Sequence, residues 1–145
     1  MSDHKPTTDE IAMARAAGLE VQPDPMPNDL PSAHDLVIKF LKSGFKNEAL
    51  DTPSADTLSL MLEDLLEMYV VLNGGSKQAI KEMQARKRFG LKKYGTLLQP
   101  FNGRDALGDS RDELGDLVVY MAVKLYEIAN DNDPIRKTEE ENASD

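Results

Sequence analysis

Apolar residues recur at intervals of three and four positions through the central part of this chain, and no segment alternates apolar and polar residues over a sustained run. The first spacing places apolar side chains on one face of an α-helix, whereas strands require the second. The pattern predicts main helices over residues 32–43, 55–72, 77–93 and 106–129, and a shorter helix fits residues 8–17. We therefore expect an all-α fold, a bundle of about four main helices.

Residues with strong capping or helix-stopping preferences stand at these boundaries, because Ser and Asp accept backbone hydrogen bonds and Gly adopts the left-handed conformation. They are Ser32, Pro53-Ser54, Asn73-Gly74-Gly75, Ser76, Gly95 and Asp105. We expect Ser32, Ser76 and Asp105 to cap helices and Gly75 and Gly95 to follow helix ends.

Each predicted helix has an apolar face, and we expect these faces to form a core, since 145 residues suffice for one. The two longest faces comprise Leu58, Met61, Leu62, Leu65, Met68 and Leu72 in the second main helix, and Leu107, Leu114, Leu117, Val118, Met121, Leu125 and Ile128 in the fourth.

One side of the last predicted helix is acidic. Asp109, Glu113, Asp116 and Tyr120 follow one another at spacings of three or four residues, so they share a helix face. Three carboxylates on one face repel each other unless water or a cation neutralises them. A hard divalent cation such as Mg²⁺ or Mn²⁺ suits oxygen ligands of this kind.

A second acidic cluster, Glu63, Asp64 and Glu67, lies in the predicted helix 55–72. Asp64 and Glu67 have the same spacing as Glu113 and Asp116, and two antiparallel helices would bring both pairs into one cage of four carboxylates. Alternatively, each cluster is the solvated face of an amphipathic helix.

The composition narrows the class of protein. The chain has no cysteine, which excludes disulfides and thiolate metal sites and fits a reducing cytosol, and its two histidines lie upstream of the predicted core. No apolar run is long enough to span a membrane, and the start of the chain does not resemble a signal peptide. We expect a cytoplasmic protein without a membrane segment.

The net charge of −9 belongs to the two ends of the chain. Residues 1–30 and residues 131–145 each carry six acidic and two basic side chains, so the centre is nearly neutral. We expect a flexible acidic tail over 1–30, one all-α domain over 31–130 and a disordered acidic tail over 131–145.

A basic segment separates the acidic clusters and has three interpretations. It consists of Lys81, Arg86, Lys87, Arg88, Lys92 and Lys93, with Glu82 as the only acid. It is a solvated helix face, a nucleic-acid patch, or a source of cations that bind nucleotide phosphates. The nearly neutral centre and the few aromatic residues argue against nucleic acid. Lys93 and Arg104 flank the loop before the acidic helix and are best placed for phosphate.

Residues 86–125 closely resemble the MazG-like proteins, from phages and bacteria, of the all-α nucleoside triphosphate pyrophosphohydrolase superfamily, and residues 55–72 resemble them more loosely. The likeness rests on K-Y-G-T-x-L from Lys93, N-G-R-D from Asn102, and the acidic motifs Glu63-Asp64-x-x-Glu67 and Glu113-x-x-Asp116. It implies Mg²⁺, with Mn²⁺ as a substitute, held by Asp64, Glu67, Glu113 and Asp116. The interval of about 45 residues between the acidic motifs exceeds the usual one, so Glu82 is an alternative ligand.

The resemblance implies hydrolysis of a (deoxy)nucleoside triphosphate, guanine nucleotides included, to the monophosphate and pyrophosphate by a homodimer or homotetramer. Glu63 or Asp109 would accept the proton of the attacking water. The substrate-binding residues would be Lys93, Tyr94, Asn102, Arg104 and Tyr120. Asn102 alternatively only shapes its loop, and Tyr120 alternatively fills the core. The competing hypothesis is a non-catalytic helical adaptor or nucleic-acid-binding protein that uses the basic helix 77–93.

Overall fold

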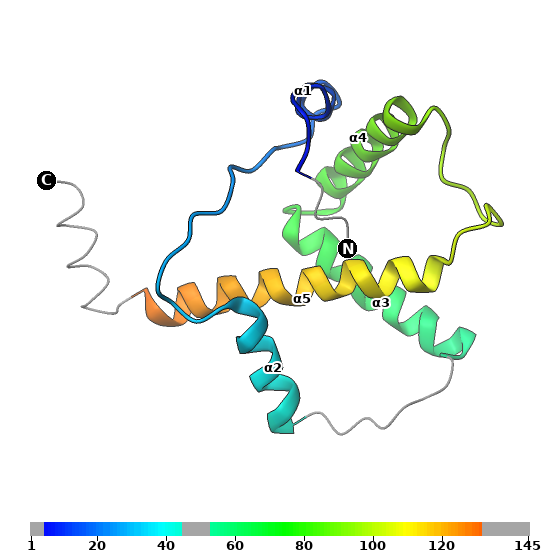
Figure 1. The fold of residues 1–145 in the computed structure, drawn as a ribbon. Coiled ribbons are helices and arrows are strands. Elements are labelled where there is room, and N and C mark those ends of the chain that lie inside the picture. Colours follow the sequence, from blue (N-terminus) through cyan, green and yellow to red (C-terminus); the bar gives the residue numbers. More distant parts are fainter. Residues whose placement is uncertain (1–4, 45–52, 132–145) are drawn as a thin grey trace, which may run out of the picture. The chain divides into compact units, whose positions relative to one another are not determined.

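The computed structural model describes residues 5–44 and 53–131 of the chain. Within these ranges the protein has five α-helices and no strand (Figure 1). They are α1 (Thr8–Ala16), α2 (Ala33–Gly44), α3 (Ala55–Leu72), α4 (Ser76–Tyr94) and α5 (Ala106–Asn130). The all-α prediction is confirmed for the described part of the chain, and each predicted helix lies within one residue of its expected bounds.

The helices belong to two compact units. In the first unit α2 packs against α5, and in the second unit α4 packs against both α1 and α3. The proposed single domain over 31–130 and the tail over 1–30 stay predictions, and nearly all of the predicted tail over 131–145 lies outside the described residues. None of the described helices is both long and apolar enough to cross a bilayer.

The helix ends follow from local hydrogen bonding. The Ser32 hydroxyl accepts a hydrogen bond from the Asp35 amide at 3.1 Å, and the Asp105 carboxylate accepts one from Gly108 at 3.0 Å. Past the end of α3, the Gly75 amide donates to the Val70 carbonyl at 2.9 Å, which satisfies a carbonyl that the helix leaves without a partner. These caps confirm the expected roles of Ser32 and Asp105 and the stop signal after Leu72.

The prediction that Ser76 caps α4 is wrong. The N-cap is Gly75, which offers no side-chain hydrogen bond, and Ser76 is the first residue of the helix. The physical reason lies in the paired glycines: Gly74 has φ +75° and Gly75 has φ +132°, conformations that residues with a Cβ rarely adopt. They turn the chain directly from α3 into α4, so the cap position falls on the second glycine.

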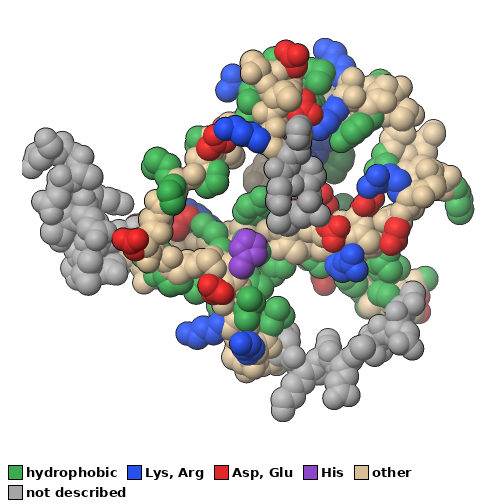
Figure 2. Space-filling model, viewed as in Figure 1, with side chains coloured by type: hydrophobic (Ala, Val, Ile, Leu, Met, Phe, Trp, Pro, Cys, Tyr) green, Lys and Arg blue, Asp and Glu red, His purple; other side chains and the backbone are tan. Residues whose placement is uncertain are grey.

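The expected core is not enclosed within either unit by itself. The buried residues of the described ranges are all alanines: Ala17, Ala79, Ala85 and Ala122. Leu62 of α3 is 56% exposed and Leu125 of α5 is 62% exposed, and apolar side chains are visible on the surface in Figure 2. Each unit has only two or three helices, too few to cover the apolar faces that the sequence provides. Within the described residues each unit by itself leaves these faces largely exposed, and their burial in one core stays a prediction.

Two glycines, one inside α4 and one at its C-cap, predict opposite effects of a Gly→Ala substitution on stability. Gly90 lies inside the helix with open space around its Cα, so Gly90→Ala should raise the free energy of unfolding by up to about 1 kcal/mol through helix propensity. Gly95 has φ +72° at the helix end, so Gly95→Ala should lower it by about 1 kcal/mol. Urea unfolding measures both, and shifts of the same sign would contradict this account of the α4 end.

Candidate metal and phosphate site

The acidic face of α5 is formed as the sequence predicts. Asp109, Glu113, Asp116 and Tyr120 all lie within this one helix, which begins at the Asp105 cap. Glu113 is exposed and Asp116 is half-buried. Tyr120 is 69% exposed, so it does not fill a core within the described structure and its ring is accessible to a ligand. The helix thus presents two carboxylates one turn apart with an aromatic side chain one turn further on.

The second acidic cluster lies on α3. Glu63, Asp64 and Glu67 are all exposed, in the middle of a helix whose N-cap is Ser54. The helices α3 and α5 belong to different units, so each unit carries one half of the predicted cage. Across the described ranges no group of three or more acidic or histidine side chains gathers as a metal site does. The four-ligand set stays a prediction.

Five of these carboxylates have no counter-ion among the described residues. Among the described residues, neither Glu113 and Asp116 on α5 nor the three acids of the α3 cluster make a side-chain hydrogen bond or ion pair. Oxygen donors without a neutralising partner are the chemistry that a hard divalent cation requires, so the residues of each half fit Mg²⁺.

Glu82, the alternative ligand, is in a different state. Its Oε1 lies 2.8 Å from Nε of Arg86, one turn further along α4. A carboxylate already neutralised by a guanidinium is a poorer ligand for a cation than one with no partner. The structure therefore favours the 63–67 cluster over Glu82 as the source of ligands.

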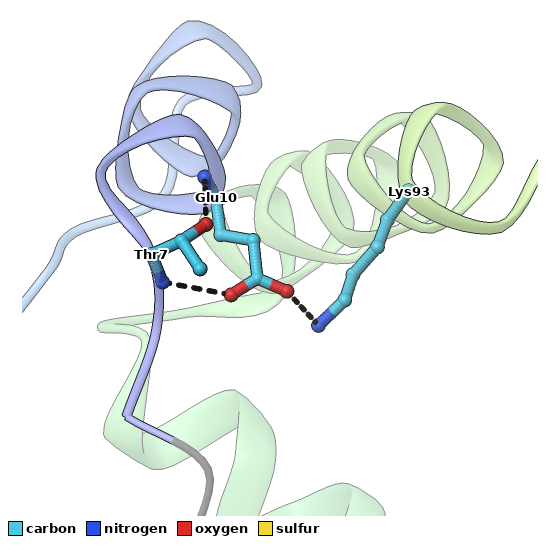
Figure 3. Close-up of polar contacts among 3 residues, drawn as sticks. All are labelled: Thr7, Glu10 and Lys93. Atoms are coloured by element: carbon cyan, nitrogen blue, oxygen red, sulfur yellow. Dashed lines mark hydrogen bonds and ion pairs between the residues drawn. The ribbon is translucent and has the colours of Figure 1, made fainter.

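The proposed phosphate-binding lysine has a partner that the sequence reasoning missed. Lys93 lies in the last turn of α4, and its Nζ is 3.1 Å from Oε1 of Glu10 on α1 (Figure 3). The same ammonium lies 5.8 Å and 5.4 Å from the ring centres of Phe89 and Tyr94. The hydrogen bond that the Lys93 ammonium donates to Glu10 raises the pKa of Lys93 above its ordinary value of 10.5. The sequence pattern Thr7-x-x-Glu10 is typical of a helix start and carries no signal of this distant contact.

The loop from α4 to α5 uses one of its predicted ligands for its own shape. The Asn102 side-chain oxygen accepts a hydrogen bond from the Arg104 amide at 3.0 Å, an arrangement that fixes a turn. This supports the alternative in which Asn102 shapes the loop. Phe101 has φ +57° and is fully exposed, and Tyr94 at the start of the loop is 69% exposed.

Half of the cations in the basic segment are engaged within the protein. Arg86 pairs with Glu82, Lys93 pairs with Glu10, and an Arg88 guanidinium nitrogen donates to the Ala17 carbonyl at 3.2 Å. The two carboxylate contacts, to Arg86 and Lys93, neutralise positive charge and weaken the attraction of this face for a polyanion, which disfavours the nucleic-acid interpretation.

No family model matches this chain, and no curated protein or solved structure matches it either.

The Lys93–Glu10 contact predicts a measurable pKa difference. In Glu10→Gln the pKa of Lys93 should fall below its value in the unmodified protein, because the main cause of the upward shift is removed. The Lys93–Glu10 contact also stabilises the fold, because the folded-state pKa of Lys93 is raised. This contribution is fully present below pH 10.5 and is lost as the pH rises through the higher folded-state pKa. NMR titration of the Lys93 ε-methylene group tests it, and an unchanged pKa in Glu10→Gln would contradict the assignment.

Proposed function

We propose that this protein is a Mg²⁺-dependent nucleoside triphosphate pyrophosphohydrolase of the MazG-like kind that acts in the cytoplasm. The observation that carries the proposal is the set of carboxylates on α3 and α5 that have no counter-ion within the described residues. The KYGT and NGRD segments, which lie between these two helices in the sequence, add polar and cationic groups. The product pair would be a nucleoside monophosphate and pyrophosphate.

The proposed chemistry divides among these groups. Asp64, Glu67, Glu113 and Asp116 would hold Mg²⁺, which lowers the pKa of a bound water and withdraws charge from the phosphates. A carboxylate that does not bind the metal, Glu63 or Asp109, would then accept the proton of the attacking water.

The substrate would be held by the cationic and aromatic residues around the loop. Lys93 and Arg104 would stabilise the charge that develops on the polyphosphate as the anhydride bond breaks. The exposed rings of Tyr94 and Tyr120 would contact the base and the sugar or phosphate.

Replacement of Glu113 tests the enzyme directly. Glu113→Gln should lower kcat/KM by about 100-fold or more, because it removes a charged metal ligand from the reaction centre. Glu127→Gln is the matched control, since it makes the same change on α5 about 21 Å further along the helix axis and should leave activity unchanged. The assay measures pyrophosphate and monophosphate release from eight nucleoside triphosphates with Mg²⁺, with Mn²⁺ and with a chelator.

The outcomes separate the two hypotheses. Metal-dependent release that Glu113→Gln abolishes, and Glu127→Gln does not, supports the enzyme and names its base. Folded protein that releases nothing from any triphosphate with either metal would reject the enzyme and favour the adaptor.

We also propose that the protein assembles as a homodimer or homotetramer. The apolar stripe of α3 includes Leu58, Leu62 and Leu65, which are 38%, 56% and 37% exposed. A helix surface of this kind is stabilised when another apolar surface covers it, and a second copy supplies one of matching chemistry.

A charge on this stripe should disrupt the assembly. Leu62→Glu should shift the mass in solution toward the monomer of 16.1 kDa, because the carboxylate would be desolvated at the interface. Leu98→Glu is the control, because Leu98 is 86% exposed in the loop before α5. Light scattering after size-exclusion chromatography measures both masses. If the unmodified protein is already a monomer at micromolar concentration, the proposed assembly is wrong.

A further inference from the structure

The short helix α1 is specified at both ends. At its start, the Thr7 hydroxyl accepts from the Glu10 amide at 3.2 Å, while Oε2 of Glu10 accepts from the Thr7 amide at 2.9 Å. At its end, Gly18 has φ +89° and the Leu19 amide donates to the Ala14 carbonyl at 2.9 Å. Nine residues nevertheless make a marginal helix in water even with good caps. Its position therefore depends on the surface against which it packs, which is α4.

The contact between α1 and α4 combines small apolar residues with hydrogen bonds. Ala17 and Ala85 are 6% and 4% exposed, and a Cβ at Gly18 would lie 3.9 Å from the Ala85 methyl group, so the backbones approach closely. Arg88 donates to the Ala17 carbonyl at the C-terminal end of α1, where the helix dipole favours a cation. This contact holds one end of α1, and Lys93 holds the other through Glu10.

Glu10 divides its two carboxylate oxygens between the helix start and the lysine. Oε2 closes the capping box with Thr7, and Oε1 lies 3.1 Å from Nζ of Lys93 (Figure 3). The side chains of Glu10 and Lys93 are only 18% and 31% exposed. An anionic oxygen at this distance makes the contact that a phosphate oxygen would make with the same ammonium. An ammonium has three N–H donors, so a phosphate that reaches Lys93 meets a cation whose charge Glu10 already offsets.

We propose that α1 is an autoinhibitory arm whose Glu10 carboxylate neutralises Lys93 as an internal anion, so that a polyphosphate binds this lysine in competition with Glu10. The inference rests on the proposed function in one respect, namely that Lys93 is a phosphate-binding residue. It adds a regulatory step: the arm sets the affinity for the polyphosphate and competes with it. Because the second Glu10 oxygen caps α1, displacement releases the lysine without removing the cap.

The substitution Glu10→Gln isolates the charge, because glutamine also closes a capping box and α1 keeps its start. Asp9→Asn is the matched control, since it removes the same charge in the same helical turn from a residue that does not contact Lys93 in the described structure. Lys93→Gln and the double variant Glu10→Gln/Lys93→Gln complete a cycle that shows whether the effect acts through the lysine.

The probe is inorganic tripolyphosphate, whose binding is measured by isothermal titration calorimetry in chelator. Glu10→Gln should bind it about 2- to 5-fold more tightly than the unmodified protein, the range expected for the loss of a partly exposed ion pair. Asp9→Asn should change the affinity less, and the gain from Glu10→Gln should vanish when Lys93 is also replaced. An equal gain in Asp9→Asn, a gain that survives without Lys93, or no gain at all would overturn the proposal, as would no binding by any variant.

The binding measurement and the hydrolysis assay fail independently. If Glu10→Gln tightens tripolyphosphate binding through Lys93 but no nucleotide is hydrolysed, the autoinhibitory role of α1 is supported and the proposed pyrophosphohydrolase activity is rejected. If hydrolysis depends on Glu113 but the Glu10→Gln cycle shows no coupling to Lys93, the proposed enzyme activity is supported and the autoinhibitory role of α1 is rejected.

Discussion

The constraint on which the rest of the structure depends is that each of the four longer helices, α2 to α5, carries more apolar surface than its own unit covers. The buried side chains of the described ranges are alanines, which allow close backbone approach but contribute little hydrophobic free energy. Larger side chains such as Leu62 and Leu125 remain more than half exposed. Marginal stability is the normal condition of a protein, and a fold that leaves its leucines in water gains most from association. The proposed self-association follows from this imbalance.

The same constraint bears on the acidic helices. Their carboxylates lie on helices whose apolar residues also need cover, so packing that covers those residues reduces the water around the acids. Burial raises the free energy of an isolated carboxylate, and clustered carboxylates are tolerated there only with a compensating cation. The proposed metal binding and the proposed assembly would therefore favour each other, because Mg²⁺ would offset a repulsion that packing would strengthen.

Local physics made the helices predictable and long-range physics made their surroundings unpredictable. Ser32, Asp105 and the stop after Leu72 act through hydrogen bonds within five residues, so the sequence suffices to place them. The prediction that Ser76 caps α4 was wrong because the consecutive glycines Gly74 and Gly75 change the path of the backbone. Periodicity identifies the apolar face of a helix but not what covers it, which is why the expected core stays a prediction. The acidic faces were predictable as helix positions, whereas their combination into one site depends on how separate units pack.

Lys93 shows why a motif alone does not define the state of a site. Its place in the KYGT segment predicts that Lys93 binds phosphate, yet its ammonium already has an anionic partner, Glu10 of α1. A ligand of modest charge would gain little by exchanging one ion pair for another, whereas a triphosphate brings several charges and reaches further groups at the same time. The internal carboxylate therefore raises the threshold for weak anions more than for polyphosphates. If Lys93 binds phosphate as proposed, the short capped helix α1 would in this way add selectivity for highly charged ligands.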